Sequence, residues 1–480
     1  MRSLDNKSNK NNKDLATLLA EVKEDKINER KAKEKNYFFQ IDVIKTICII
    51  CVIISHSISR FGFDIESYWQ VIRPVELFIL LLGFNQGNSF KRQGLKKLGD
   101  MYTTQYFKRM FWRIIFPLII VNIFCWIIDL IIYYLNGFHI QGWSNAYGPV
   151  YGAVIDLGNT DPAIQAYMLL GVPFFPGPGE YYITILLQFI LIFPLLYKLF
   201  DKNPKLGLII CFLIELCFQI AAKNIPILHN LYEKYHFLFC GSIFRYFFLI
   251  GLGLYFINNS NLFSKKNAFI WPMLIIALYL ITGAGLFNGS PLLPSSWYPN
   301  ELFELRWGSS FGIKFFRTDP WWHTANLFTY SYTAVVFLLF MKILPSKLND
   351  NKKSLKNISR FFKGIAKLTY HILLVQIVYF FIAIPLEGVF HNPNGVFYDI
   401  IVNPVVAPYL DAWGNLNVGT LDLGTSILIL TTKLFVGILA LSICISIAYM
   451  FYKLEFSIQR VLKKENSSQK SNQQQISIES

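Results

Sequence analysis

Residues Ile41–Arg60 read IDVIKTICIICVIISHSISR, an apolar run that carries the ionisable side chains Asp42, Lys45 and His56. On a helix the eleven steps from Lys45 to His56 make close to three turns, so both side chains point the same way about 16 Å apart. Asp42 lies within a turn of Lys45. Ionisable groups are costly inside a membrane helix, so the default interpretation is functional. The alternative is an interfacial Asp42–Lys45 ion pair and a hydrogen-bonded core histidine.

The composition around this run is that of a membrane protein. Hydrophobic residues make up 54% of the 480 positions and charged residues only 16%, and the apolar runs are too long and too many for soluble cores. All seven cysteines fall inside apolar segments, so they are expected as small buried hydrophobes without a disulfide framework. The net charge of +15 does not indicate a nucleic-acid partner, because the basic residues collect in alternate loops.

We expect an all-α, polytopic membrane protein with about ten transmembrane helices between two polar tails. Residues 1–36 are predicted to be a cytoplasmic polar tail, 37–460 the transmembrane domain and 461–480 a disordered cytoplasmic tail. No cleavable signal peptide is visible. The predicted spans are 37–59, 69–89, 111–136, 179–200, 205–221, 236–257, 267–287, 325–344, 365–386 and 426–452.

The charges of the loops predict the orientation. Loops 90–110 and 342–363 are rich in Lys and Arg, whereas loops 137–178 and 388–425 contain neither. Positive residues mark the cytoplasmic side, so with an even number of helices both termini are expected in the cytoplasm and the chain in the cell membrane.

The outer loops are long and rich in aromatic residues, which is uncommon unless a segment binds something. The cluster Trp321, Trp322 and His323 is the strongest candidate for binding a sugar, whose C–H face packs on aromatic rings. The alternative for any single Trp is the aromatic belt at the membrane interface.

The run Ile41–Arg60 resembles the first motif of the acyltransferase 3 family of integral membrane acyltransferases, in which ten residues separate a basic residue, usually Arg, from a His. Here Lys45 stands in the Arg position and lacks its planar fork. Four later segments resemble further family motifs in the same order, with Gln376 where the family usually has His; they are 74–84, 106–117, 367–376 and 449–455.

The resemblance implies a ten-helix domain that moves an acyl group from cytosolic acyl-CoA, most often acetyl-CoA, to a glycan or lipid-linked sugar outside. It implies His56 as general base, since a histidine pKa suits proton removal at neutral pH. Asp42 and Glu76 are candidate catalytic residues that would orient His56 or shift its pKa through their charge, with helix packing as the alternative. Glu455 is considered as a partner for a cation, and Arg245 and Tyr370 are lesser candidates. The predicted cations for the CoA phosphates are Lys45, Lys108, Arg109 and Arg113.

Acyl-CoA is expected as a substrate, with no permanently bound cofactor and no metal, because no metal-binding spacing is present. Membrane lipid is the other expected partner. The rival function is an exporter or flippase of a polysaccharide or lipid-linked precursor. A transporter of that kind is expected to show repeats or paired broken helices, and none is evident in the sequence.

Overall fold

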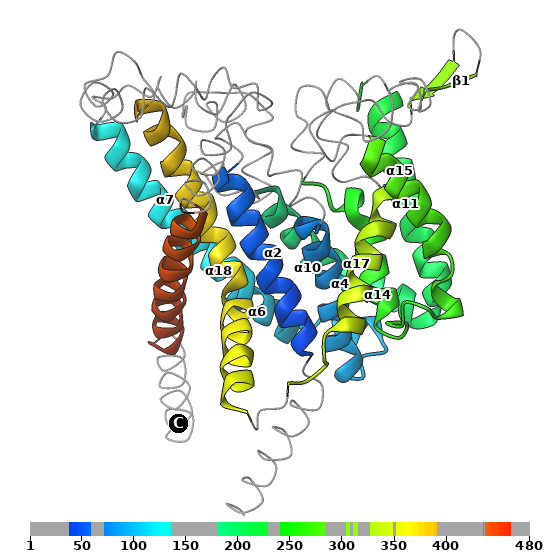
Figure 1. Ribbon diagram of the computed structural model, residues 1–480, viewed down its shortest axis with the longest axis horizontal. Helices are drawn as coiled ribbons and strands as arrows, with labels where there is room; N and C mark the ends of the chain where they lie inside the picture. Colours follow the sequence, from blue (N-terminus) through cyan, green and yellow to red (C-terminus); the bar gives the residue numbers. More distant parts are fainter. Residues whose placement is uncertain are drawn as a thin grey trace, which may run out of the picture.

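The computed structural model describes residues 38–58, 72–135, 180–225, 227–228, 241–283, 304–307, 311–314, 327–348, 352–390, 435 and 437–461. These residues form a bundle of long helices (Figure 1). Each of the ten predicted spans contains a described helix. The long helices are α2 (Phe39–Ile58), α4 (Pro74–Arg92), α7 (Phe116–Leu135), α10 (Glu180–Lys202), α11 (Pro204–Asn224), α14 (Phe247–Phe256), α15 (Ile270–Gly283), α17 (Tyr330–Ile343), α18 (Lys353–Phe390) and the C-terminal helix (Gly437–Val461).

Shorter elements lead into these helices. They are α5 (Leu98–Met101), α6 (Thr104–Met110), the π-helix η2 (Phe111–Ile115) and the 3₁₀ segments η3 (Ile243–Tyr246), η4 (Lys265–Asn267) and η6 (Leu327–Thr329).

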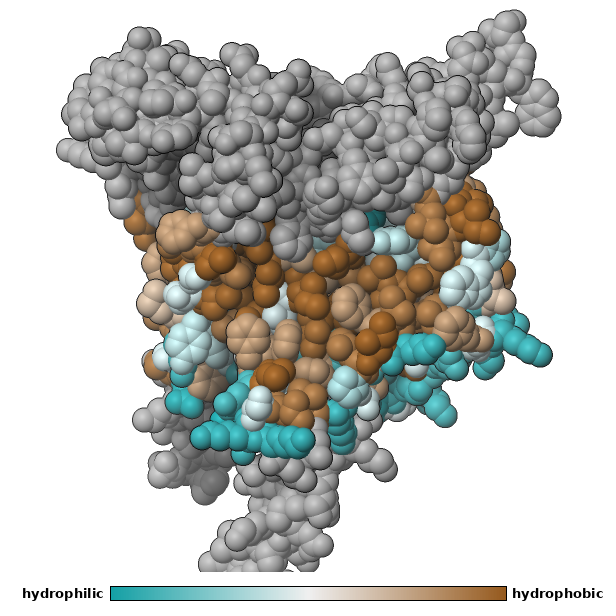
Figure 2. All heavy atoms as spheres, viewed as in Figure 1, coloured by the Kyte–Doolittle hydropathy of each residue, from teal (hydrophilic) through white to brown (hydrophobic). Residues whose placement is uncertain are grey.

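Among the described residues, four helices are long and apolar enough to cross a membrane: Tyr182–Lys202, Pro204–Ala222, Lys353–Tyr379 and Gly437–Val461. Figure 2 shows a broad hydrophobic band with hydrophilic side chains gathered along its lower edge. Large apolar side chains such as Leu191 and Ile209 are more than half exposed on this surface, as expected where lipid replaces water. The protein is therefore a membrane protein. The count of ten spans and the cytoplasmic position of both termini stay predictions.

Two glycines let α4 and α14 pack backbone to backbone. A Cβ at Gly83 would lie 2.4 Å from the carbonyl oxygen of Ile250, and one at Gly253 would lie 2.1 Å from that of Leu80. Small residues allow such close approach in membrane helix pairs. A Cβ at Gly87 would meet Leu254, four residues beyond Ile250, so α4 and α14 run in the same direction.

Helix α2 packs against α4 on one side and α18 on the other (Figure 1). Side-chain hydrogen bonds fix its first turns: Gln40 Nε2 donates to the Met341 and Leu344 carbonyls at 2.9 Å, and the Thr46 hydroxyl donates to the Phe362 carbonyl at 3.3 Å. The apolar run with Asp42, Lys45 and His56 thus lies in a central helix.

The described residues are nearly all helical, as expected, with one short β-hairpin in addition. Strands β1 (Glu304–Trp307) and β2 (Phe311–Lys314) pair antiparallel, with Trp307 opposite Phe311. This hairpin falls in the predicted loop 288–324, where backbone groups that belong to no helix pair with each other. The predicted tails 1–36 and 462–480 lie outside the described residues, and Val461, assigned to the tail, ends the C-terminal helix.

Candidate functional site

Helix α2 presents Asp42 and Lys45 from a mostly buried surface. Ile44 and Cys48 are fully buried, whereas Asp42 and Lys45 are half-buried. The charge of Asp42 acts on Lys45, so the two side chains lie within electrostatic range of each other. The backbone of His56 lies in α2, two residues before its last residue, Ile58. The side chain of His56 lies outside the described residues, so its role as a base stays a prediction.

Pro117 explains the π-helix that precedes α7. In an α-helix its ring would clash with the Arg113 carbonyl four residues earlier, and proline has no N–H for that carbonyl. In η2 the N–H of Phe116 instead bonds the carbonyl of Phe111, five residues back. Single π turns of this kind occur frequently at functional sites. Arg113 lies at the middle of this one.

The π-helix places Arg113 within electrostatic range of Lys45. The charge of Arg113 acts on Lys45, and Arg109, one turn earlier, acts on Arg113. Arg113 and Arg109 both keep exposed side chains. Residues 68 positions apart in the sequence, 45 and 113, therefore form one cationic site with Asp42 at its edge. Lys108 is also exposed, but it is not among the charges acting on Lys45 or Arg113.

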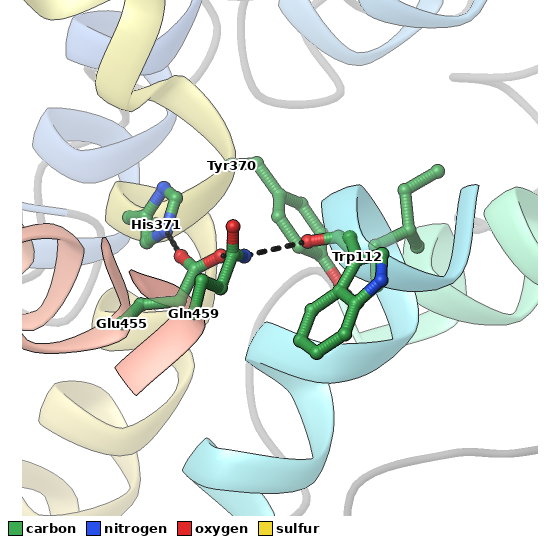
Figure 3. Close-up of polar contacts among 6 residues, drawn as sticks. Trp112, Tyr370, His371, Glu455 and Gln459 are labelled. Carbon is green, nitrogen blue, oxygen red and sulfur yellow. Dashed lines mark hydrogen bonds and ion pairs between the residues drawn. The ribbon is translucent and has the colours of Figure 1, made fainter. Parts of the chain in front are cut away.

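Two hydrogen bonds from other helices hold the π-helix (Figure 3). The Tyr370 hydroxyl on α18 donates to the Ile114 carbonyl at 2.9 Å, and Gln459 Nε2 donates to the Trp112 carbonyl at 3.2 Å. Pro117, five residues after Trp112, has no N–H to give this carbonyl. The Gln459 side chain thus replaces the backbone donor that proline lacks.

A buried pair supports Gln459 in turn. Gln459 Nε2 also donates to Glu455 Oε1 at 2.5 Å, and Glu455 Oε2 pairs with His371 Nε2 on α18 (Figure 3). The His371 ring packs against Phe451 and Tyr452 with centroids 5.2 and 5.3 Å away. Glu455 therefore pairs with His371. From the sequence, its expected partner was one of the predicted CoA-binding cations.

His371 and Gln459 were missed from the sequence. The available signal for His371 was an ionisable residue inside an apolar span, the same signal that drew attention to His56. For Gln459 there was none, because its role depends on a carbonyl exposed by Pro117 in another helix.

Glu76 lies in the first turn of α4 and is buried. Its Oε1 is 3.4 Å from Nε of Arg73, also buried, and its charge acts on Cys48 of α2. Glu76 thus faces the helix that carries His56, but its effect on His56 stays a prediction. Trp321, Trp322 and His323 lie outside the described residues. Among the described residues, no group of three or more His, Cys, Asp or Glu side chains is placed to hold a metal ion.

An apolar helix bundle in which cationic side chains of α2 and η2 lie within electrostatic range of each other defines the class as a membrane protein. A family model described as "Acyltransferase domain" matches residues 38–451. The chain therefore belongs to the acyltransferase 3 family, as its motifs indicated. No curated protein and no solved structure matches the chain.

Proposed function

We propose that this membrane acyltransferase moves an acyl group, acetyl by family resemblance, from cytosolic acyl-CoA to a hydroxyl of a cell-surface glycan or lipid-linked sugar. The observation that carries the proposal is the pairing of Lys45 and Arg113. Two cations within electrostatic range repel each other, and a bound anion would offset that repulsion. Asp42 supplies one negative charge. The phosphates of acyl-CoA would supply the rest.

In the proposed reaction His56 removes the proton of the acceptor hydroxyl as its oxygen attacks the thioester carbonyl. The tetrahedral intermediate collapses with cleavage of the C–S bond. CoA leaves as the thiolate and takes up a proton, and the acceptor becomes an ester. Lys45 and Arg113 hold the phosphates at one end of α2, and His56 acts about three turns away at the other end. The pantetheine arm would bridge this length.

The test is release of CoA thiol by purified protein given labelled acetyl-CoA and a sugar acceptor. We expect the natural sequence to release thiol and label the acceptor, and His56→Ala to lose at least 100-fold of the rate, the low end of general-base catalysis. The control is Ser442→Ala, an exposed serine on the C-terminal helix, which should keep the rate within about twofold, since a surface change costs little.

Full activity of His56→Ala would remove histidine as the base. Transport of a labelled lipid-linked precursor without thiol release would instead favour the exporter.

A further inference from the structure

Arg73 has an unexpected backbone conformation at the start of α4. Its φ of 54° and ψ of 56° make it the one non-glycine residue with positive φ in the described part of the chain. The proline that follows favours an extended conformation for residue 73, so local sequence does not account for it. Such strained residues persist where the surrounding structure fixes them, and they cluster at binding sites.

The Arg73 guanidinium is buried but incompletely paired. Arg73 is 4% exposed, and within the described residues its Nε and Nη2 have no hydrogen-bond partner. The contact with Glu76 at 3.4 Å from Nε is an ion pair without hydrogen-bond geometry. A buried charge with unused donors is costly, and a bound oxyanion would satisfy it bidentately.

The Glu76 contact also places the guanidinium over the first turn of α4. Pro74 occupies the first helical position, and Arg73 provides no side-chain cap. The N–H groups of Val75 and Glu76 therefore lie at the start of a 19-residue helix, where the helix dipole favours anions. The Arg73 guanidinium and the N-terminus of α4 therefore lie together, and such an arrangement can bind phosphate and carboxylate groups.

This place lies toward the His56 end of α2. Phe39 N–H bonds the Ser346 carbonyl, so α2 starts beside the lysine-rich 342–363 segment. The rings of Phe38 and Phe84 lie 6.2 Å apart, so the later part of α4 lies beside the start of α2. The two helices are therefore antiparallel neighbours. The charge of Glu76 acts on Cys48, so these two residues lie at about the same height along the helix pair. Because the helices are antiparallel, a position three residues earlier on α4 corresponds to a position about three residues later on α2. On the helical rise, Arg73 is level with about residue 51, and the His56 backbone is roughly 7 Å further along.

We propose that Arg73 and the N-terminus of α4 bind a phosphate or carboxylate group of the acceptor. This inference rests on the proposed function and names its substrate class: an anionic sugar. A hydroxyl that reaches His56 while the anion contacts Arg73 would belong to the same sugar or the next one. The donor cations Lys45 and Arg113 are a separate site, nearer the lysine-rich end of the bundle.

The experiment compares three acceptors on one alkyl glycoside: a sugar phosphate, the corresponding uronic acid and the neutral sugar. We expect the natural sequence to acylate one anionic form at least tenfold more efficiently, by kcat/KM, than the neutral one. Arg73→Gln should abolish that preference and leave the neutral acceptor and acceptor-independent thiol release within twofold. Arg73→Lys should restore part of it. The control is Arg92→Gln, an exposed arginine at the other end of α4.

Equal rates with charged and neutral acceptors, or an equal loss on all three in Arg73→Gln, would overturn the inference. The better of the two anionic forms tells phosphate from carboxylate. Binding of the sugar phosphate and of the uronic acid, measured directly in the absence of acyl-CoA, tests the anion site separately from the acyl-transfer reaction. Arg73-dependent binding without thiol release by the natural sequence would refute the acyltransferase reaction and keep the anion site. Thiol release without Arg73-dependent binding would refute the anion site and keep the acyltransferase reaction.

Discussion

At the scale of single residues, the proposed donor site depends on Lys45 and on Arg113, whose charge acts on it. Lys45→Ala removes a charge-assisted contact, worth about 1.5–3 kcal/mol, so we expect KM for acetyl-CoA to rise roughly 10- to 100-fold with a smaller change in kcat. Lys45→Arg keeps the charge and should hold KM within about threefold. Thiol-release kinetics measure both, with exposed Lys97→Ala as the control. An unchanged KM in Lys45→Ala would place the CoA phosphates elsewhere.

Tyr370 offers a second test, because its hydroxyl contacts the π-helix carbonyl of Ile114 and no side chain of the donor site. Tyr370→Phe loses one hydrogen bond, so we expect about 1 kcal/mol less stability. KM for acetyl-CoA should rise while acceptor KM stays constant, because Arg113 is less well positioned. Tyr449→Phe, a half-exposed tyrosine on the C-terminal helix, is the matched control. An equal rise in the KM for acetyl-CoA and the KM for the acceptor would indicate a general loss of helix packing and contradict the prediction.

At the scale of elements, Pro117 is the residue that converts one turn into a π-helix. Pro117→Ala restores the N–H and removes the clash, so the segment can become a regular α-helix. Losing the extra residue would turn Arg113 by about 100° relative to α7. We expect a folded protein with weaker donor binding, measured as acetyl-CoA affinity. Pro194→Ala inside α10 is the control. Unchanged affinity would mean that the π-helix does not position Arg113.

The α4–α14 contact makes a prediction about stability alone. A methyl group at Gly253 would lie 2.1 Å from the Leu80 carbonyl oxygen, so the helices must separate. Gly253→Ala should lower the unfolding temperature in detergent. Gly364→Ala on α18 has no atom within 4 Å of the new Cβ and should be neutral or stabilising by up to about 1 kcal/mol. Equal unfolding temperatures for the two variants would contradict the close packing.

At the scale of the whole molecule, the sequence predicted what depends on local patterns. Each predicted span contains a helix because long apolar runs satisfy their backbone polar groups internally. The Lys45–Arg113 pairing and the His371–Glu455 pair were not predictable in this way, since they depend on how helices distant in sequence pack together. The β1–β2 hairpin was missed because four-residue strands leave little periodic signal.

The candidate site was predictable in part. The sequence identified Lys45, Arg109 and Arg113, and the structure brings them together. It could not show that Pro117 shapes the turn around Arg113, or that Tyr370 and Gln459 hold that turn. His56, Trp321, Trp322 and His323 stay predictions, because their side chains lie outside the described residues.

The central claim is acyl transfer from a donor on the cytoplasmic side to an acceptor on the other. The direct measurement uses proteoliposomes with inserted protein of one orientation, labelled acetyl-CoA on the side of the lysine-rich loops and sugar acceptor on the opposite side. We predict labelled ester on the acceptor in the opposite compartment, with loss of the signal in His56→Ala. Labelled acceptor only when donor and acceptor share a compartment would contradict the account.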